Sequence, residues 1–296
     1  MGEKGAGRME RTKYRVLLCA ADYGSFSKAA ELTGYTPSGV AHMMNAVEAE
    51  FGFPVFVRGR RGVALTEDGK RVLPVLRELA RWDEQLEQTV SEIRGLSTGV
   101  VTIGAYSSIA SHWLPPVIKR FKRDFPGIRV RLMEGIRQEV ESWLAQRRVD
   151  LAFYSYQEPM PYEWIPLKDD PMLAVLPADH PLAGAAEYPV EACMEENFIM
   201  PALGRDDDVA ELLSRLRLSP RVSLSTPENY AAMCMIEQGL GMSIMNELIT
   251  KNWDCDVALL PLRPPQHITL GIAVPALAEA SPAARKFVAY ARELAE

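Results

Sequence analysis

Small polar side chains repeat along one side of a helix predicted near the amino terminus. At 100° per residue, Ser38, His42, Asn45 and Ala49 fall on one face of the segment that begins at Pro37. A serine hydroxyl and an asparagine amide can exchange hydrogen bonds with base edges, and an imidazole can contact a base or a phosphate. This face suits the major groove of DNA. A solvated helix surface without a ligand is the alternative.

A cluster of arginines follows this helix. Arg58, Arg60 and Arg61 flank Gly59 in a segment whose apolar residues and glycines predict a β-hairpin. Guanidinium groups pair with phosphates and enter minor grooves. A solvated turn would explain the arginines alone, but their place beside the polar helix favours nucleic acid.

The charge of the chain is unevenly distributed. The formal net charge is −6, yet residues 1–65 hold nine Lys/Arg against six Asp/Glu, a net charge of +3. The remaining chain holds 24 basic and 33 acidic residues, a net charge of −9. Because contact with phosphates needs positive charge, the amino-terminal segment is the part suited to bind DNA.

Three helices and the hairpin are expected to position these side chains. Residues 15–21 are predicted to form the first helix, Ser25 to cap a second that ends at Gly34, and Thr36 to cap the third. Pro37 takes the first position of the third helix, where its missing N–H costs nothing. The inward stripe of that helix has apolar residues spaced by four, three and four positions: Val40, Met44, Val47 and Phe51. The arrangement is a winged helix-turn-helix, a unit that reads DNA.

This segment resembles the head of the LysR-type transcriptional regulators. The resemblance rests on residues spread from position 25 to 69: Ser25-Phe26-Ser27-Lys28-Ala29-Ala30-Glu31, Val40, Glu48, Gly52, Phe53-Pro54-Val55-Phe56, Arg58, Leu65-Thr66 and Gly69. It covers nearly the whole chain from about residue 11. Pro37, Ala41 and His42 stand where glutamine, serine and arginine are common in the family, which bears on the base sequence that is read.

The candidate DNA-binding residues follow from this chemistry and this resemblance. They are Ser25, Lys28, Thr36, Pro37, Ser38, His42, Asn45, Arg58, Arg60 and Arg61. The partner that they imply is double-stranded operator DNA.

A long helix without turn signals is expected from Thr66 to Arg94. Its apolar residues recur at intervals of three and four: Val72, Leu76, Leu79, Trp82, Leu86, Val90 and Ile93. So narrow a stripe on a helix of roughly eight turns is typical of a coiled coil between two chains, with packing on the chain's own body as the alternative. Two paired heads could read half-sites about 34 Å apart. Residues 95–99 are the expected hinge.

Strands and helices alternate from Val100 onward. The expected strands are residues 100–105, 128–133, 149–154 and 267–274, and the expected helices are residues 112–123, 136–147, 207–216, 227–238 and 281–294. This alternation predicts a parallel sheet in an α/β fold. Two crossings of the chain divide it into lobe I, about 100–168 and 265–296, and lobe II, about 169–264. Such a body resembles periplasmic binding proteins, as the effector domains of LysR-type regulators do.

Hydroxyl groups follow the first predicted strand of this body. Tyr106-Ser107-Ser108 ends the strand and opens a helix, where hydroxyls and amides can hold a carboxylate or another anion. The family resemblance also places effectors at this loop and at the facing ends of the second lobe. The candidate effector-binding residues are Ser107, Ser108, Phe153, Tyr154, Ser155, Pro201, Thr226, Glu228 and Asn229. Helix capping is the alternative for the serines, and core packing is the alternative for the aromatic residues.

Signals of other protein classes are absent from the sequence. We find no nucleophile elbow, phosphate loop or dinucleotide fingerprint, and the four histidines are too far apart for a local metal motif, so we expect no catalytic residues, metal or cofactor. No apolar run approaches the ~20 residues that span a bilayer, and no apolar signal segment begins the chain, so we expect a cytoplasmic protein without a membrane partner. The four cysteines lack paired spacing and are expected to be buried thiols: Cys19, Cys193, Cys234 and Cys255.

The expected organisation is a DNA-binding domain at residues 1–65, a dimerisation helix at 66–95 and an effector-binding domain at 96–296. We expect a homodimeric or homotetrameric LysR-type regulator that controls transcription in response to a small molecule, with an anion as one candidate and RNA polymerase as a further candidate partner. Two alternatives stay open. One is a small-molecule binding protein or enzyme whose head only mediates assembly, and the other is a redox-sensing regulator that uses Cys193, Cys234 or Cys255.

Overall fold

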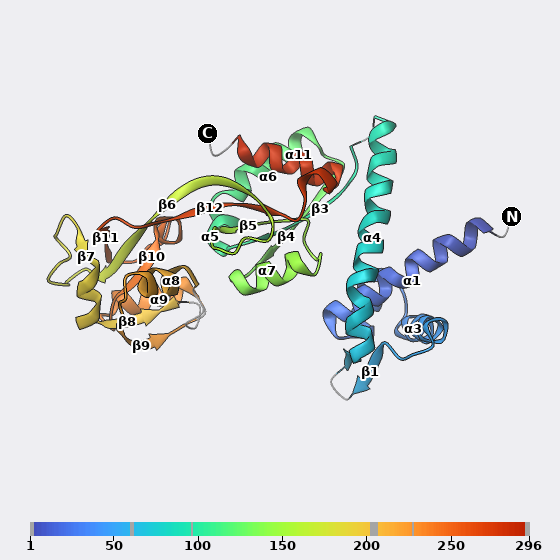
Figure 1. Ribbon diagram of the computed structural model, residues 1–296, viewed down its shortest axis with the longest axis horizontal. Helices are drawn as coiled ribbons and strands as arrows, with labels where there is room; N and C mark the ends of the chain where they lie inside the picture. The colour runs from blue at the N-terminus through green and yellow to red at the C-terminus, as the bar shows by residue number, and fades with distance from the viewer. Residues whose placement is uncertain (1–2, 60–61, 96, 202–206, 227, 294–296) are drawn as a thin grey trace. The chain divides into compact units, whose positions relative to one another are not determined.

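The computed structural model describes residues 3–59, 62–95, 97–201, 207–226 and 228–293 (Figure 1). Its contacts divide the chain between Arg94 and Gly95 into two units, and the amino-terminal unit also includes residues 146–148.

The amino-terminal unit opens with three helices: α1 (Glu3–Tyr23), α2 (Phe26–Thr33) and α3 (Pro37–Phe51). The hydroxyl of Ser25 accepts the N–H of Lys28 at 3.2 Å, and the hydroxyl of Thr36 accepts the N–H of Gly39 at 3.1 Å. Each bond satisfies an amide of a first helical turn. Both predicted caps are therefore confirmed.

Helix α1 is longer than the sequence pattern predicted. It begins at Glu3, whereas we expected a start at Arg15. No proline lies between these positions, and Gly5 and Gly7 each weaken a helix by only about 1 kcal/mol. The helix therefore continues through a segment that carries no apolar stripe.

The apolar sides of the three helices meet in one core. Val40, Met44 and Val47 of α3 are buried, as predicted, and pack with Val16 and Leu17 of α1. The core positions of α3 follow the 3.6-residue period, so the opposite side of the helix faces outward.

A hairpin follows α3, with β1 (Phe56–Gly59) antiparallel to β2 (Gly62–Leu65). The Glu48 carboxylate accepts the N–H groups of Val55 at 2.7 Å and Phe56 at 2.9 Å, which fixes the hairpin's entry against α3. Gly62 lies so close to Gly24 that a Cβ there would stand 2.3 Å from the Gly24 carbonyl oxygen. The predicted winged helix-turn-helix is confirmed.

Helix α4 (Glu67–Ile93) continues from the hairpin. Thr66 caps it by accepting the N–H of Gly69 at 2.9 Å, as predicted. Its first turns are held against α1 by Arg77, whose guanidinium pairs with the Asp22 carboxylate at 2.5 Å. The single expected helix between the head and the body is therefore present.

The carboxy-terminal unit contains the remaining elements. Its first part comprises β3 (Gly99–Ala105), α5 (Ser107–His112), α6 (Leu114–Asp124), β4 (Ile128–Glu134), α7 (Arg137–Ala145), β5 (Leu151–Ser155) and β6 (Glu163–Pro177). Its second part comprises β7 (Tyr188–Pro189), β8 (Asn197–Met200), α8 (Asp207–Arg215), β9 (Arg221–Ser225), α9 (Asn229–Glu237), β10 (Ser243–Asn246) and α10 (Glu247–Thr250). The chain ends with β11 (Val257–Arg263), β12 (His267–Val274) and α11 (Pro282–Arg292).

The main sheet is mixed, which corrects the expected parallel sheet. Its order is β4-β3-β5-β12-β6-β11-β7, and β10 pairs with β6 off this path. Strands β3, β4 and β5 are parallel, whereas β12 is antiparallel to both β5 and β6. The alternation of strands and helices could not predict this, because β12 enters the sheet from the far end of the chain.

Two cores give this unit its two lobes. The lobe I core includes Ile103, Phe121 and Phe287, and the lobe II core includes Tyr188 and Phe198. Strands β6 and β12 run from one lobe to the other (Figure 1). The α/β, two-lobed fold is therefore confirmed.

The structure has two helices where the sequence predicted one. We expected residues 112–123, but α5 ends at His112 and α6 begins at Leu114. Pro115 and Pro116 explain the break, because proline lacks the N–H that would continue α5 and is tolerated in the first turn of α6.

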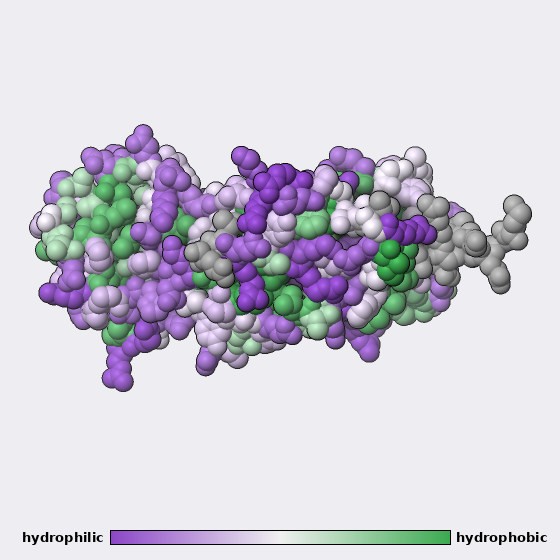
Figure 2. Space-filling view, turned by 90° about the horizontal axis from the view of Figure 1, so that it is seen from above, coloured by the Kyte–Doolittle hydropathy of each residue, from purple (hydrophilic) through white to green (hydrophobic). Residues whose placement is uncertain are grey.

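The surfaces of the two lobes differ in apolar exposure. Figure 2 shows apolar side chains gathered on lobe II, at the left of the face seen there. The exposed large apolar side chains of this lobe are Met194, Val222, Leu224, Tyr230, Leu240, Trp253 and Leu259.

Candidate nucleic-acid interface and effector site

The polar face of α3 lies at the surface of the head. Ser38, His42, Asn45 and Ala49 are all exposed, opposite the buried stripe of the same helix. The Ser38 hydroxyl lies 3.2 Å from that of Thr36. The helix thus presents hydroxyl, imidazole and amide groups in one row, which are the groups that base edges require.

Asn45 and Arg58 form one unit, although they are 13 residues apart. The Arg58 guanidinium donates to the Asn45 side-chain oxygen at 2.5 Å and lies over the Phe26 ring at 5.3 Å from its centroid. The Phe26 ring in turn packs edge-on against Phe56. Two candidate contacts that the sequence assigned to separate elements are therefore positioned together by α2, α3 and the hairpin.

The other candidate DNA contacts lie around this unit. Lys28 is exposed and pairs with Glu31 at 2.9 Å. The hydroxyls of Ser25 and Thr36 accept capping amides, so each keeps its own O–H as a donor. Pro37 occupies the first position of α3. Arg60 and Arg61 lie outside the described residues.

The apolar stripe of α4 divides into two parts. Leu76 is 3% exposed and belongs with Val72 to the core of the head, which corrects their assignment to a dimer seam. The first turns of α4 pack on α1, so these side chains are already covered. The rest of the stripe is 40% to 80% exposed: Leu79, Trp82, Leu86, Val90 and Ile93.

Tyr106 and the serines after it open α5, as expected. Ser107 is exposed and Ser108 half-buried at the start of this helix. Tyr106 occupies the capping position without a side-chain capping bond, and its hydroxyl lies 3.1 Å from the Ser155 hydroxyl. The loop after β3 and the end of β5 therefore meet.

The three residues at the end of β5 have different surroundings. Phe153 lies in the lobe I core against Phe287, so it belongs to the core rather than to the site. Tyr154 is fully buried, and its ring lies under the Arg137 guanidinium at 5.1 Å. Ser155 is also buried, and it faces a polar cluster.

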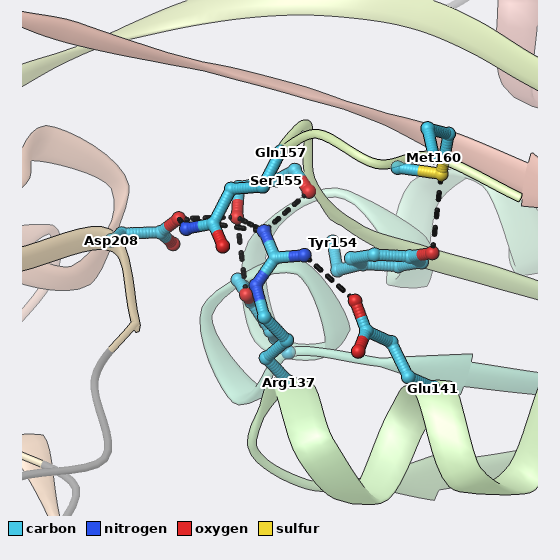
Figure 3. Close-up of polar contacts among 8 residues, drawn as sticks. Arg137, Glu141, Tyr154, Ser155, Gln157, Met160 and Asp208 are labelled. Carbon is cyan, nitrogen blue, oxygen red and sulfur yellow. Dashed lines mark hydrogen bonds and ion pairs between the residues drawn. The ribbon is translucent and has the colours of Figure 1, made fainter. Parts of the chain in front are cut away.

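That cluster joins five side chains (Figure 3). Arg137 donates to the Ser155 carbonyl oxygen at 2.7 Å and hydroxyl oxygen at 2.5 Å, and pairs with Glu141 at 2.8 Å. Asp208 accepts the Ser155 hydroxyl at 2.5 Å and the Gln157 amide at 2.8 Å. We call Arg137, Ser155 and Gln157 the lobe I donors.

The cluster holds a permanent buried cation. Burial alone would lower the pKa of the Arg137 guanidinium, but Tyr106, Asp208 and Glu141 outweigh burial and raise that pKa above its ordinary value. Burial also raises the pKa of Tyr154, so the ring under Arg137 stays a neutral phenol. Arg137 therefore stays charged at any physiological pH, and its carboxylate partners are Glu141 and Asp208.

Sequence reasoning missed Arg137, Gln157 and Asp208. Arg137 follows the carboxyl end of β4, the neighbour of β3, so the rule that ligands bind beyond strand ends could have found it. Gln157 lies just past β5 for the same reason. No sequence signal brings Asp208 here, because α8 belongs to the other lobe.

The candidates from lobe II lie near its own strand ends. Pro201 is buried directly after β8, and Thr226 is buried directly after β9. The Thr226 hydroxyl accepts the N–H of Glu228 at 3.3 Å, and Asn229 begins α9. These residues surround the β8–β9 pair. In the described part of the chain, lobe II contacts the lobe I donors through Asp208.

Cys193 and Cys255, two of the candidates for redox sensing, have a raised pKa. Burial raises the pKa of Cys193 and of Cys255 to about 11, so both are protonated and weakly nucleophilic at neutral pH, which does not favour redox sensing. Within these residues, no three His, Cys, Asp or Glu side chains are placed to hold a metal ion. No helix there has the length and apolarity to cross a membrane.

Comparison with known proteins gives consistent matches along the chain. A family model described as the bacterial regulatory helix-turn-helix protein of the lysR family matches residues 12–70, and one described as the LysR substrate binding domain matches residues 94–296. An uncharacterized HTH-type transcriptional regulator of Bacillus subtilis, YvbU, is 32% identical over 97% of this chain and 99% of its own length.

Solved structures share the fold. A full-length OxyR variant from Pseudomonas aeruginosa has a TM-score of 0.75 at 20% identity, covering 96% of this chain and 94% of its own. The effector binding domain of QuiR, in complex with shikimate, has a TM-score of 0.61 at 22% identity, covering 67% of this chain and 97% of its own.

Proposed function

Because the chain belongs to the LysR family of bacterial DNA-binding transcriptional regulators, we propose which of its residues carry DNA binding, pairing and effector response. We assign DNA binding to residues 1–65, pairing to 66–95 and effector binding to 96–296. The assembly alternative loses its basis, because the family match includes the head as a DNA-binding unit.

The head binds operator DNA with α3 in the major groove. Ser38, His42 and Asn45 contact base edges, and Arg58 contacts the backbone beside them. Lys28, the caps of α2 and α3, and the hairpin arginines contact flanking phosphates. The exposed polar row opposite a buried stripe is the observation that carries this assignment.

Two chains pair through the exposed part of the α4 stripe. Large apolar side chains on a solvent-facing helix gain stability when a partner helix covers them. The five exposed residues of the stripe support this pairing, and a homodimer or homotetramer is the resulting assembly. Pairing places two heads on one operator in the cytoplasm, where bacterial DNA lies.

A small molecule binds in the body near the lobe I donors. Ser107, Ser108 and Ser155 lie at neighbouring strand ends of lobe I, and Thr226, Glu228 and Asn229 lie at those of lobe II. The shikimate complex of QuiR supports a small-molecule effector for a domain of this fold. Effector binding changes the geometry of the paired heads on DNA, and thereby the access of RNA polymerase.

Gel shift with the wild-type chain tests this function. The probe is the region upstream of its own gene, and the competitor is a scrambled sequence of the same length and composition. We expect selective binding that weakens as salt rises, because base contacts give selectivity and phosphate contacts give salt dependence. Equal affinity for both DNAs would contradict the assignment.

A further inference from the structure

One carboxylate from lobe II occupies the donor set of lobe I. Asp208 lies at the start of α8, and its oxygen accepts from Ser155 and Gln157 while lying 3.5 Å from the Arg137 guanidinium (Figure 3). The Arg137 and Asp208 side chains are 6% and 9% exposed. This contact is therefore shielded from water, where charge-assisted hydrogen bonds are strong.

The donor set suits a carboxylate that comes from outside. A hydroxyl, an amide N–H and a guanidinium converge on one oxygen position, which is how proteins hold carboxylates. Within the described residues, the buried Nε of Arg137 has no hydrogen-bond partner. Asp208 thus leaves part of the guanidinium unused, whereas a ligand carboxylate free to turn could engage two of its N–H groups.

The contact can open without disrupting either lobe. Asp208 lies on a helix that packs in the lobe II core, while the donors come from α7 and the end of β5 in lobe I. The buried side chains of α8 pack in the lobe II core, whereas those of α7 and β5 pack in the cores of lobe I. Opening the Asp208 contact would leave these packed side chains in place, and an effector-driven switch requires two such discrete arrangements.

We propose that Asp208 is an internal stand-in for the effector: the effector carries a carboxylate that displaces Asp208 from Arg137, Ser155 and Gln157 and so releases lobe II from lobe I. This inference rests on the proposed effector site in the body. It adds the chemical class of the effector and the contact that the effector replaces.

Acetate is the probe, because it is the aspartate side chain without the backbone. In Asp208→Ala, the donors lose their occupant, and acetate can enter the space that the carboxymethyl group leaves. At about 100 mM acetate we expect the melting temperature of the full-length variant to rise by about 2 to 4 °C. In the wild type, Asp208 already occupies the donors. Half of the rise in melting temperature should therefore need an acetate concentration at least tenfold higher than in Asp208→Ala.

Three controls isolate the carboxylate. Acetamide has the same shape without the charge, and sodium chloride at equal ionic strength provides charge without the shape. Neither should stabilise Asp208→Ala. Arg137→Gln combined with Asp208→Ala should abolish the acetate effect, and Glu211→Ala, at an exposed position of the same helix, should behave as the wild type.

Several results would overturn the inference. One is acetate protection that is equal in Asp208→Ala and the wild type, and another is its absence from the variant. Should Asp208→Ala not fold, Asp208→Asn keeps the shape but holds Arg137 less strongly. The Asp208→Asn variant should then be half-saturated at an acetate concentration several-fold lower than the wild type. An unchanged half-saturating concentration would reject the proposal.

The operator footprint connects this contact to regulation. In acetate, Asp208→Ala has the donors filled and lobe II released, so its footprint on the upstream DNA should differ in length from the wild-type footprint. Identical footprints would reject the switch. Failure of the proposed function is a separate result, because it appears as loss of selective DNA binding by the wild type, whatever acetate does.

Discussion

At the residue scale, the bond between Arg58 and Asn45 makes two candidate DNA contacts interdependent. Arg58 donates to the Asn45 oxygen and rests on the Phe26 ring, so truncating either Arg58 or Asn45 removes one support of the other. The proposed base contact and the proposed phosphate contact are thus linked by one hydrogen bond.

We predict that Asn45→Ala and Arg58→Ala have effects on operator affinity that are not additive. Arg58→Ala should weaken binding to all sequences and lower the salt slope by about one unit, and Asn45→Ala should cost about 1 to 3 kcal/mol with loss of discrimination at one base pair. The double variant should fall short of their sum by about 0.5 kcal/mol or more. Affinities over a salt series, on the operator and on single-base variants of it, measure this. Strict additivity would show that the pair separates on DNA.

A second residue with a testable role is Asp170, buried in β6. Its carboxylate accepts the Asn246 amide and the N–H of Leu248, the latter at 3.1 Å. Burial raises the pKa of this carboxyl above its ordinary value of 3.8, and the two hydrogen bonds only partly oppose that effect. The folded chain therefore binds more protons than the unfolded chain above pH 3.8, so Asp170 subtracts stability as the pH rises through the raised pKa.

We predict that Asp170→Asn gains stability relative to the wild type as the pH rises from below 4 to neutral. The amide keeps an oxygen for both donors but has no charge to bury. Urea unfolding at several pH values gives the difference in free energy of unfolding. Asp254→Asn, at an exposed position, is the control. A difference that shrinks as the pH rises would contradict the burial argument.

At the element scale, the apolar stripe of α4 has two kinds of surroundings along its length. Its first turns complete the core of the head through Leu76, and its later turns leave large apolar side chains exposed. One periodic stripe therefore splits into an internal contact and the exposed surface that we propose a second chain covers.

We predict that Leu86→Glu converts the dimer to monomers without unfolding the head. Leu86 is 55% exposed in one chain, so the change costs little there, whereas a dimer would bury two unpaired carboxylates. The dimer dissociation constant should rise about a hundredfold or more. Sedimentation velocity measures this, with Glu87→Lys, outside the stripe, as control. A dimer unaffected by Leu86→Glu would move the interface elsewhere.

Local signals predicted elements better than long-range ones. Caps at Ser25, Thr36 and Thr66 were found because a hydroxyl and its amide lie three residues apart, and β12 was predicted at its observed bounds. The direction of β12 in the sheet was wrong, because no local pattern encodes which distant strand it joins. For the same reason, Ser155 was found at a strand end, while Asp208 was not.

At the scale of the whole molecule, DNA binding and effector binding lie in separate units of the chain. Neither unit alone can regulate transcription in response to an effector. Effector binding can change transcription only if it changes the arrangement of the assembly that holds the DNA-binding heads. In the proposed dimer, the paired α4 helices fix how the two heads meet one duplex.

The affinity for operator DNA should therefore depend on where the spacing between the half-sites falls within a helical turn of the duplex. We predict that inserting about five base pairs between the half-sites weakens binding strongly, and that inserting about ten restores much of it, because a full turn returns both major grooves to the same side of the duplex. Gel shifts with both inserts measure the ratio, and the same inserts placed outside the half-sites are the control. Leu86→Glu should remove the phase dependence, since unpaired heads bind each half-site independently. Equal affinity for all spacings in the wild type would mean that the α4 pair does not hold the two heads in a fixed relation.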